Sequence, residues 1–407
     1  MGKTVDGEGD RGSDALVRLT EPGAAEALVE RAPDGVWHVR GFQEAREILR
    51  GSVVQEGFNA DLVRRMPSQM SPPVLFQDGP AHREQRVQTA RYFTPAVTRE
   101  RHVPGMAAYA ESIVGELERT GRADLHAMAA RMAISVAADV VGLTDGDRGA
   151  MAGRLRRILR ADLSASRSPR RILAYARVQW NVLLFYLRDV RPAIRARREA
   201  PRDDVISHLL AKGRRGTEIM AECITYGAAG MVTTQEAICL AAWQCLRRPE
   251  LGRIMREADD ETRLRLVQEL LRLEPVVGHL YRRAATDLDV ATDGRTEAIP
   301  AGSLIDLDVT AIGADPRAAG ERPLHLMPDR PIERGIPRSL LAFGSGPHHC
   351  AGEHIALAET DVFLRRLLAV RGLRIEREPT IGHNGNIHGY ELAEFRIACD
   401  PVAGPAS

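Results

Sequence analysis

One cysteine of this chain lies in a glycine-rich loop that leads directly into a helical pattern. The loop reads Phe343-Gly-Ser-Gly-Pro-His-His-Cys350-Ala-Gly352. Backbone N–H groups and the positive end of a helix stabilise negative charge, and the glycines let the backbone come close to the sulfur. We therefore expect Cys350 to stay ionised as a thiolate that can bind iron. The alternative is a glycine-rich turn around an inert buried cysteine.

The spacing of this loop resembles the heme-binding loop of the cytochrome P-450 family, whose pattern is Phe-Gly-x-Gly-x-His-x-Cys-x-Gly. Every fixed position of the pattern is matched. The resemblance implies that Cys350 is the axial ligand of the iron of heme b, where a thiolate pushes electron density into the iron and favours O–O cleavage. One departure is Leu340, where many bacterial members have a histidine. The resemblance also assigns to the heme loop Phe343, Gly344, His348 and Gly352.

Heme carries propionate groups, which require cationic or hydrogen-bonding partners where the site is partly dry. His82 and Arg86, at i,i+4 spacing on a helical pattern, resemble the propionate-binding helix of the family. Arg282 resembles the strand arginine of the family, although its neighbour Arg283 leaves the register open by one residue. His348 in the cysteine loop is a further candidate. Each residue alone is more typical of an ordinary surface, and only their joint presence in the order of the family favours a propionate site.

A second motif lies on a long helical pattern. Ala229-Gly230-Met-Val232-Thr233-Thr234 resembles the oxygen-activating Ala-Gly-x-acid-Thr motif of the family, in which a small residue leaves space for dioxygen and the acid and hydroxyl relay protons. The resemblance implies catalytic roles for Ala229, Gly230 and Thr233. Val232 stands at the acid position and cannot carry a proton, so we expect protons to come from the substrate or ordered water, or the reaction to depend less on the relay. Without Cys350, the segment would be taken for an apolar buried helix.

Glu269 and Arg272 are at i,i+3 spacing on a helical pattern, which places both side chains on one face. Such a pair is usually solvated and contributes well under about 1 kcal/mol. The resemblance instead implies the buried Glu-x-x-Arg pair of the family, locked to an arginine of the segment before the cysteine loop, here Arg330. Removing one partner of a buried pair costs roughly 3 to 5 kcal/mol, because the other charge is stranded. The pair would then serve folding and heme retention.

Length and composition set further bounds. At 407 residues the length alone allows two or three domains of about 150 residues each. The 56 Lys and Arg residues balance 55 Asp and Glu residues, so the net charge predicts neither nucleic acid nor a membrane surface as partner. The five cysteines, an odd number without zinc-like spacing, argue against a disulfide framework or structural zinc, which fits a reducing cytoplasm. Residues 1–14 lack the apolar core of a signal peptide and predict a disordered tail, and the apolar stretch 132–143 is shorter than the roughly 20 residues that span a bilayer.

Helical periodicity dominates from residue 81 onward and predicts a mainly α protein with small peripheral β-sheets. Residues 315–338, rich in Pro, Arg and Gly, are expected to form an ordered meander, and we expect residues 15–407 to form a single heme-binding domain. The expected helices cover residues 43–49, 97–118, 125–141, 172–190, 204–210, 217–247 and 262–273. The expected strands cover residues 36–39, 288–291, 304–309, 373–376 and 394–398, with a turn at 299–302.

Substrate-facing segments follow from the resemblance alone. They are the loop 53–76, the region 155–186, the helix around 226–233, residues 276–280 and the turn 386–389. The stretch 154–177 is strongly basic, with Asp162 as its acidic residue. Its arginines form a solvated helix face or attract an anionic substrate or an acidic carrier protein. They are Arg154, Arg156, Arg157, Arg160, Arg167, Arg170, Arg171 and Arg177.

The motifs occur in the order of the family and span the chain from about residue 36 to its end. The resemblance implies a bacterial, cytoplasmic cytochrome P-450 that receives electrons from NAD(P)H through a ferredoxin or flavodoxin reductase chain. It would oxidise a small organic substrate, expected to be a secondary-metabolite intermediate that is free or bound to a carrier protein. Hydroxylation is the default reaction, and Val232 adds weight to coupling or desaturation. The alternative is a heme-binding protein without oxygenase turnover that recruits a partner.

Overall fold

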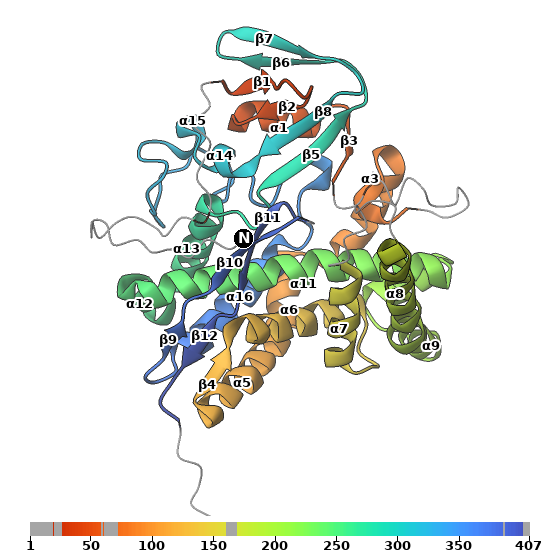
Figure 1. The fold of residues 1–407 in the computed structure, drawn as a ribbon, viewed down its shortest axis with the longest axis vertical. Coiled ribbons are helices and arrows are strands. Elements are labelled where there is room, and N and C mark those ends of the chain that lie inside the picture. The colour runs from red at the N-terminus through yellow and green to blue at the C-terminus, as the bar shows by residue number, and fades with distance from the viewer. Residues whose placement is uncertain are drawn as a thin grey trace, which may run out of the picture.

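The computed structural model describes residues 19, 27–57, 60, 72–159, 169–385 and 387–401. Helices form most of the molecule and small sheets lie at its periphery, so the predicted fold class is confirmed (Figure 1). Within the described residues, no helix is both long and apolar enough to cross a membrane.

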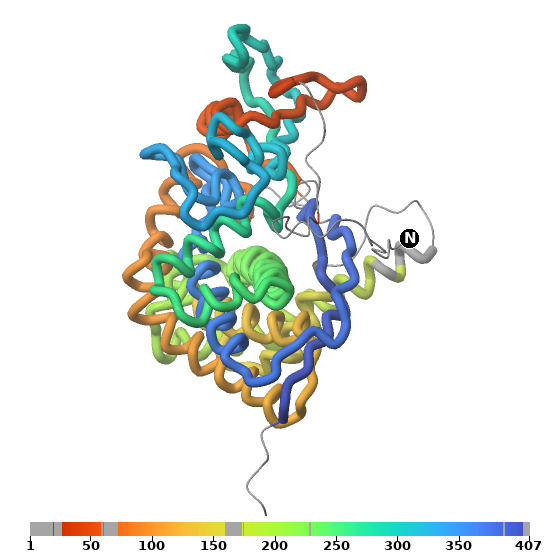
Figure 2. The backbone as a smooth tube through the Cα atoms, turned by 90° about the vertical axis from the view of Figure 1, so that its left-hand side faces the viewer, coloured from red at the N-terminus to blue at the C-terminus, as the bar shows by residue number. Residues whose placement is uncertain are grey.

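The longest helix, α11 (Gly216–Arg247), runs through the middle of the molecule (Figure 1). Its 32 residues extend over about 48 Å. Figure 2 shows it end-on, with other helices around it. Ile238, Leu240 and Ala242 on this helix have no exposed surface. The helix α6 (Leu125–Val141) packs along it, as the apolar pattern of residues 125–141 predicts.

Two expected helices are interrupted. Residues 97–118 divide into α4 (Pro95–Val97), a π turn η2 (Thr98–His102) and α5 (Val103–Thr120). Residues 172–190 divide into α8 (Pro169–Phe185) and a π turn η3 (Tyr186–Val190), after which α9 (Arg191–Glu199) continues. The prediction of continuous α-helices is therefore wrong in both places. Pro104 and Pro192 follow the two π turns, and a proline cannot donate the i→i−4 hydrogen bond, so the helix widens before it.

The other helices surround α11 or cover the sheets. They are α1 (Phe42–Arg50), α3 (Gly79–Ala90), α7 (Arg148–Leu159), α10 (Val205–Ala211), α12 (Pro249–Glu257), α13 (Asp260–Leu273), α14 (Val309–Gly313), α15 (Pro316–Ala319) and α16 (Glu353–Leu368), with the 3₁₀ turns η1 (Val74–Phe76) and η4 (Gly346–His348).

The largest sheet has five strands. Their order is β1 (Val29–Arg31), β2 (Trp37–Val39), β8 (Leu304–Asp308), β5 (His279–Ala284) and β3 (Val53–Gln55). The strands β2 and β8 are parallel, although far apart in the sequence. Between the expected strands 288–291 and 304–309, the structure has a strand that the sequence analysis did not predict. This strand, β7 (Arg295–Ile299), pairs with β6 (Leu288–Thr292). Asp293 and Gly294 make the tight turn between them, both with positive φ, as hairpin turns of this length require.

Two smaller sheets complete the structure. One pairs β10 (Thr380–Asn384) with β11 (Gly389–Ala393), and the other places β12 (Arg396–Ala398) between β4 (Arg122–Asp124) and β9 (Arg374–Arg377). The strand expected at 394–398 begins only at Arg396, because Glu394 has a φ of 56°.

Two apolar cores meet at the cysteine loop. The larger core lies among α5, α6, α11 and α16, and the smaller one lies between the five-stranded sheet and α1. Leu340 and Leu341 belong to the smaller core, whereas Ala342 and Phe343 pack against the larger one. The loop that carries Cys350 is therefore anchored to both cores.

Glu359 of α16 gives a testable pH dependence. Its side chain is 2% exposed, Oε1 makes no hydrogen bond, and burial raises its pKa from 4.5 to about 8. The pKa of Glu359 is higher in the folded state than in the unfolded state. The stability that the protonated carboxyl contributes is therefore complete below about pH 4.5 and is lost as the pH rises towards 8. We expect Glu359→Gln to be more stable than the wild type at pH 8 by roughly 2 to 4 kcal/mol, with little difference at pH 5.

Denaturant unfolding across this pH range measures the effect. The exposed Glu257→Gln serves as the control. A stability difference between Glu359→Gln and the wild type that does not change with pH would contradict the raised pKa.

Candidate functional site

Cys350 lies between the 3₁₀ turn η4 and the first residue of α16. Its N–H group donates to the carbonyl of Phe343 at 2.8 Å. The N–H groups of Gly352 and Glu353 hydrogen-bond to the sulfur, and both favour the thiolate. The structure thus places the sulfur at the start of a helix, as the loop pattern predicts.

The protonation of this sulfur differs from the expectation. Burial among protein atoms outweighs the two N–H groups and raises the pKa of the Cys350 thiol, so the prediction that the backbone alone keeps it ionised is wrong. A coordinated metal ion deprotonates a thiol outright. Cys350 is exposed, whereas Cys223, Cys239, Cys245 and Cys399 are buried. A side chain that is exposed and yet desolvated faces a space inside the protein, where another group can reach it.

Glycines fix the shape of the loop. Gly344 and Gly346 both have a φ of 69°, where other residues are strained. A Cβ atom on Gly346 would lie 2.4 Å from the carbonyl oxygen of Leu49 in α1, which leaves no room for a side chain. The loop therefore rests directly on the backbone of α1.

The middle of α11 carries the second predicted motif. Ala229 is exposed although α11 runs through the centre of the molecule, so this turn borders an internal space. The Thr233 hydroxyl donates to the Ala229 carbonyl, and Val232 packs against the apolar core. Gly230 lies where α11 meets α6, and a Cβ atom on it would make an ordinary van der Waals contact with Ala137 at 3.6 Å. Its role beside Thr233 stays a prediction.

Four side chains assigned to the propionates converge beside Asp78. His82 and Arg86 come from α3, Arg282 from β5 and His348 from η4. The His82 and His348 rings stack with centroids 4.2 Å apart, and His348 Nε2 lies 3.0 Å from the Asp78 carboxylate. Arg86 donates to a carbonyl of the cysteine loop. The residues that the sequence motifs assign to the propionates therefore lie together in the structure.

The electrostatics of this cluster favour an anion. Burial, with the nearby positive charges of His348 and Arg86, lowers the pKa of His82 to about 4. Burial lowers the pKa of Arg282 to about 10, although the charge of Asp78 opposes this shift. Arg282 is 3% exposed and makes no ion pair within the described chain. A buried guanidinium of this kind is stabilised by an anionic ligand.

The neighbouring Arg283 has a different environment. Its Nε donates to the Glu56 carboxylate at 2.8 Å, and its Nη1 donates to the Gly302 carbonyl at 2.8 Å. Arg283 is thus bound to Glu56 and Gly302, whereas the charge of Arg282 lies near Asp78. The choice between the two arginines stays a prediction, and this difference supports Arg282.

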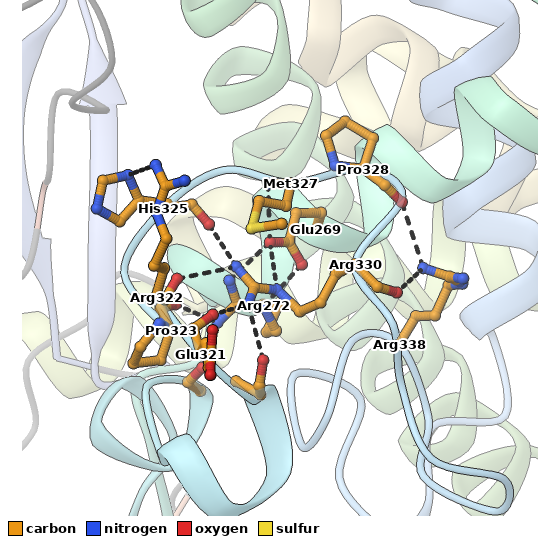
Figure 3. Close-up of polar contacts among 12 residues, drawn as sticks. Glu269, Arg272, Glu321, Arg322, Pro323, His325, Met327, Pro328, Arg330 and Arg338 are labelled. Carbon is orange, nitrogen blue, oxygen red and sulfur yellow. Dashed lines mark hydrogen bonds and ion pairs between the residues drawn. The ribbon is translucent and has the colours of Figure 1, made fainter.

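Glu269 and Arg272 form a buried ion pair (Figure 3). Both oxygens of Glu269 accept hydrogen bonds from Arg272, each at 2.7 Å. Arg330 donates to Glu269 Oε1 at 3.0 Å, and the N–H group of Met327 donates to the same oxygen at 3.1 Å. The side chains of Arg272, Arg330 and Glu269 are 0%, 1% and 5% exposed. The alternative of a solvated surface pair is therefore excluded.

The two arginines also hold the meander before the cysteine loop. Arg272 donates to the carbonyls of Gly313 and Pro323, and Arg330 donates to carbonyls of the segment 319–325 (Figure 3). Arg338 closes the network by donating to the carbonyl of Arg330 at 3.0 Å. A segment without regular hydrogen-bonded structure is thus tied to α13 by buried charges.

Comparison with known protein families matches residues 166–370, half of the chain, to the family described as Cytochrome P-450. The chain belongs to the cytochrome P-450 family. Proteins of this family are monooxygenases that bind heme b through a cysteine thiolate, and the predicted family, enzyme class and cofactor are confirmed.

Individual relatives agree with this assignment. A putative cytochrome P-450 123 of Mycobacterium tuberculosis is 27% identical over 78% of this chain and 76% of its own length. Pentalenic acid synthase of Streptomyces avermitilis is 28% identical over 84% of this chain and 82% of its own length. The crystal structure of cytochrome P-450 BioI in complex with an acyl carrier protein that bears hexadec-9Z-enoic acid has a TM-score of 0.74. It is 23% identical and covers 90% of this chain and 92% of the other, which shows a shared fold.

The residues present fit a heme. The loop offers one soft sulfur ligand that is accessible, and the cluster beside Asp78 offers two guanidinium groups and two imidazoles for a pair of carboxylates. The desolvated Arg282, with no ion pair in the described chain, is the observation that calls for such an anion. When bound, heme supplies the iron centre at which dioxygen is activated.

Two of the segments expected to face the substrate lie side by side. The N–H group of Gly278 donates to the carbonyl of His388 at 3.1 Å, and the Tyr281 and His388 rings meet edge to face at 4.8 Å. Gly389 approaches the Val276 carbonyl so closely that no side chain would fit. The structure thus joins 276–280 to the turn at 387–389, while residues 58–59, 61–71, 160–168 and 386 of the expected segments lie outside the described residues.

The sequence analysis missed several residues that position the site. Glu222 of α11 accepts from the N–H group of Val74 and from the Gln85 amide of α3, and burial raises its pKa to about 7. Glu353 accepts from His349 at 2.9 Å, and this hydrogen bond raises the histidine pKa. Both contacts join residues that no local motif links. The signal available in the sequence was an acidic residue inside an apolar helix pattern.

The Arg282 cluster yields a prediction that separates two adjacent arginines. We expect Arg282→Gln to raise the heme dissociation constant about 10-fold to 100-fold, because a charge-assisted hydrogen bond contributes roughly 1.5 to 3 kcal/mol. Arg283→Gln is the matched control and should change it little. Heme transfer to excess apomyoglobin measures both. A larger effect for Arg283→Gln would contradict the assignment.

Proposed function

We propose that Cys350 is the axial ligand of the heme iron and that His82, Arg86, Arg282 and His348 hold the propionates. The accessible sulfur at the start of α16 carries this assignment, supported by the cationic cluster beside Asp78. Phe343, Gly344 and Gly352 would shape the loop around the sulfur. Glu269 and Arg272 would keep the loop in place through the meander. We also infer that residues 15–407 form one heme-binding domain.

We propose that the enzyme oxidises a small organic substrate that is an intermediate of secondary metabolism. The relative named pentalenic acid synthase supports this substrate class. Electrons would come from NAD(P)H through a ferredoxin or flavodoxin reductase chain. The carrier protein bound to cytochrome P-450 BioI supports the further proposal that the substrate is presented on a carrier. Hydroxylation is the default reaction, with coupling or desaturation as the outcomes that the altered α11 motif favours.

Proton delivery in this enzyme would differ from the usual relay. Thr233 is the polar member of the motif, and its hydroxyl donates to the Ala229 carbonyl until it rotates toward the site. Val232 packs against apolar neighbours and holds no proton. The proton would therefore come from a hydroxyl or amine of the substrate, or from a water molecule that Thr233 orders.

A restored acid tests this proposal. We expect Val232→Asp to give little gain, or a loss, in the fraction of consumed NADPH that appears as product, because a carboxylate in an apolar pocket is costly to bury. Val232→Asn is the matched control without charge, and Thr233→Ala should lower the same fraction. A large gain in this fraction for Val232→Asp but not for Val232→Asn would contradict the proposal. It would show that an acid at this position completes a proton relay that the wild-type enzyme lacks.

The missing acid also favours a second candidate function, a heme-binding protein without oxygenase turnover that recruits a partner. A ligand screen distinguishes the two proposals. Secondary-metabolite intermediates are tested for the high-spin shift of the heme band, and each hit is tested for NADPH consumption with a surrogate reductase and ferredoxin. Hits that accelerate NADPH consumption support the monooxygenase, whereas hits that shift the band without consumption support the second function.

A further inference from the structure

Exposed apolar side chains are concentrated on one helix. Within the described part of the chain, seven large apolar residues are exposed, and five of them lie on α8 and the first residues of η3. These five are between 40% and 59% exposed. The helix lies at the margin of the molecule and packs on α7 (Figure 1). The five residues are Leu173, Tyr175, Trp180, Leu183 and Leu187.

Four of these residues follow a heptad pattern. If Leu173 is given position a, Trp180 and Leu187 also fall at a, while Ala176 and Leu183 fall at d. Ala176 is exposed as well. Val178 and Phe185 fall at f on the opposite side of the helix, and both are buried in the protein. From Leu173 to Leu187 the a and d residues thus form an apolar seam that points away from the core, the arrangement with which one helix packs along another. The seam ends in the π turn η3, where Val190, at the next d position, is buried.

The charge beside the seam has one sign. Arg177 falls at position e and is exposed, and Arg188 in the π turn η3 and Arg191 directly after it are exposed as well. Asp189, the acidic residue of this stretch, is turned inward and accepts two hydrogen bonds from Arg154, at 2.6 and 2.7 Å. Arg154 therefore belongs to a buried ion pair and not to a solvated helix face, which is one of the two roles expected for the basic stretch. The exposed charges that remain in residues 173–191 are all arginines.

This charge pattern selects the occupant. A second copy of the chain would bring the arginines beside both seams close to one another, which disfavours self-association. A membrane surface suits a broad apolar face, whereas this seam occupies the a and d positions and is bordered by Gln179 at position g and Arg177 at position e. We propose, independently of the function proposed above, that an acidic amphipathic helix of a partner protein packs along the α8 seam. Its apolar residues would cover Trp180 and Leu183, and its carboxylates would pair with Arg177 and Arg191.

A designed helix tests the surface without knowledge of the natural partner. The probe is a fluorescent four-heptad peptide with Leu at a and d and Glu at e and g, and its control has the same composition in scrambled order. We expect the holoprotein to bind the heptad peptide at least about 10-fold more tightly than the scrambled one, and Trp180→Ala to weaken this binding about 10-fold or more. The double change Arg177→Glu and Arg191→Glu should transfer the preference to a peptide with Lys at e and g. Added salt should weaken the wild-type binding.

Leu183→Ala and Leu324→Ala form a matched pair, because Leu183 is 45% exposed on the seam and Leu324 is 44% exposed elsewhere. Only the first should weaken binding. Equal affinity for the heptad and scrambled peptides would overturn the proposal. So would Trp180-dependent binding to vesicles of phosphatidylcholine and phosphatidylglycerol without peptide discrimination, or a wild-type dimer that Trp180→Ala dissociates.

Discussion

The Cys350→Ala variant is expected to lack the red-shifted Soret band that the reduced CO complex of a thiolate-ligated heme shows. Cys350 is the exposed cysteine of the chain, and backbone N–H groups of Gly352 and Glu353 hydrogen-bond to its sulfur. Alanine removes the ligand and leaves the loop backbone unchanged. Because the cationic cluster beside Asp78 remains, the variant should still take up heme, with lower affinity. The CO difference spectrum and the heme-to-protein ratio measure the two effects separately.

A buried cysteine provides the control for this experiment. Cys399 is 3% exposed, and its sulfur lies 3.5 Å from the Leu117 carbonyl, so this side chain is not part of the cysteine loop. Cys399→Ala should retain the red-shifted band. If Cys350→Ala retains it as well, another residue ligates the iron and the assignment of Cys350 is wrong.

The second large effect is expected for the buried pair of α13. Glu269→Ala strands two guanidinium groups, those of Arg272 and Arg330, which are 0% and 1% exposed. Loss of one partner of such a pair costs roughly 3 to 5 kcal/mol, a large part of the stability of a folded protein. The meander that Arg272 and Arg330 hold in place leads directly into the cysteine loop. Without this support we expect the variant to lose heme as well as stability. Denaturant unfolding and heme content of the purified variant are the measurements.

The same helix offers a matched control. Glu261 pairs with Arg265 on the surface of α13, and the glutamate side chain is 76% exposed. Glu261→Ala should change the free energy of unfolding by less than about 1 kcal/mol and leave heme in place. A Glu269→Ala variant that is stable and filled with heme, and differs only in turnover, would contradict a structural role for the pair.

Most of the features that the sequence analysis predicted correctly come from local sequence patterns. The cysteine loop, α6 and α11 depend on residues close together in the chain, where glycine positions and apolar periodicity decide the structure. Nonlocal features were missed, among them the parallel pairing of β2 with β8 and the position of Glu222 beside Val74. These contacts depend on how distant segments pack, which periodicity does not encode.

Two errors have particular physical causes. The pKa of Cys350 is raised because desolvation depends on the whole fold around the sulfur, whereas the sequence displays only the N–H groups next to it. The helices expected at 97–118 and 172–190 contain π turns, because apolar periodicity does not display the backbone hydrogen bonds that are lost before Pro104 and Pro192.

The oxygen atom in the product tests the central claim most directly. A ligand that gives the high-spin shift is incubated with the enzyme, NADPH, a surrogate reductase and ferredoxin under ¹⁸O₂, and the product is analysed by mass spectrometry. The account predicts substrate-dependent NADPH consumption and a product that contains one ¹⁸O atom, or an oxidised product without it if the reaction is coupling or desaturation. Ligands that shift the heme band but give neither NADPH consumption nor an oxidised product, with a reductase chain that reduces the heme, would contradict a monooxygenase and leave a heme-binding protein without turnover.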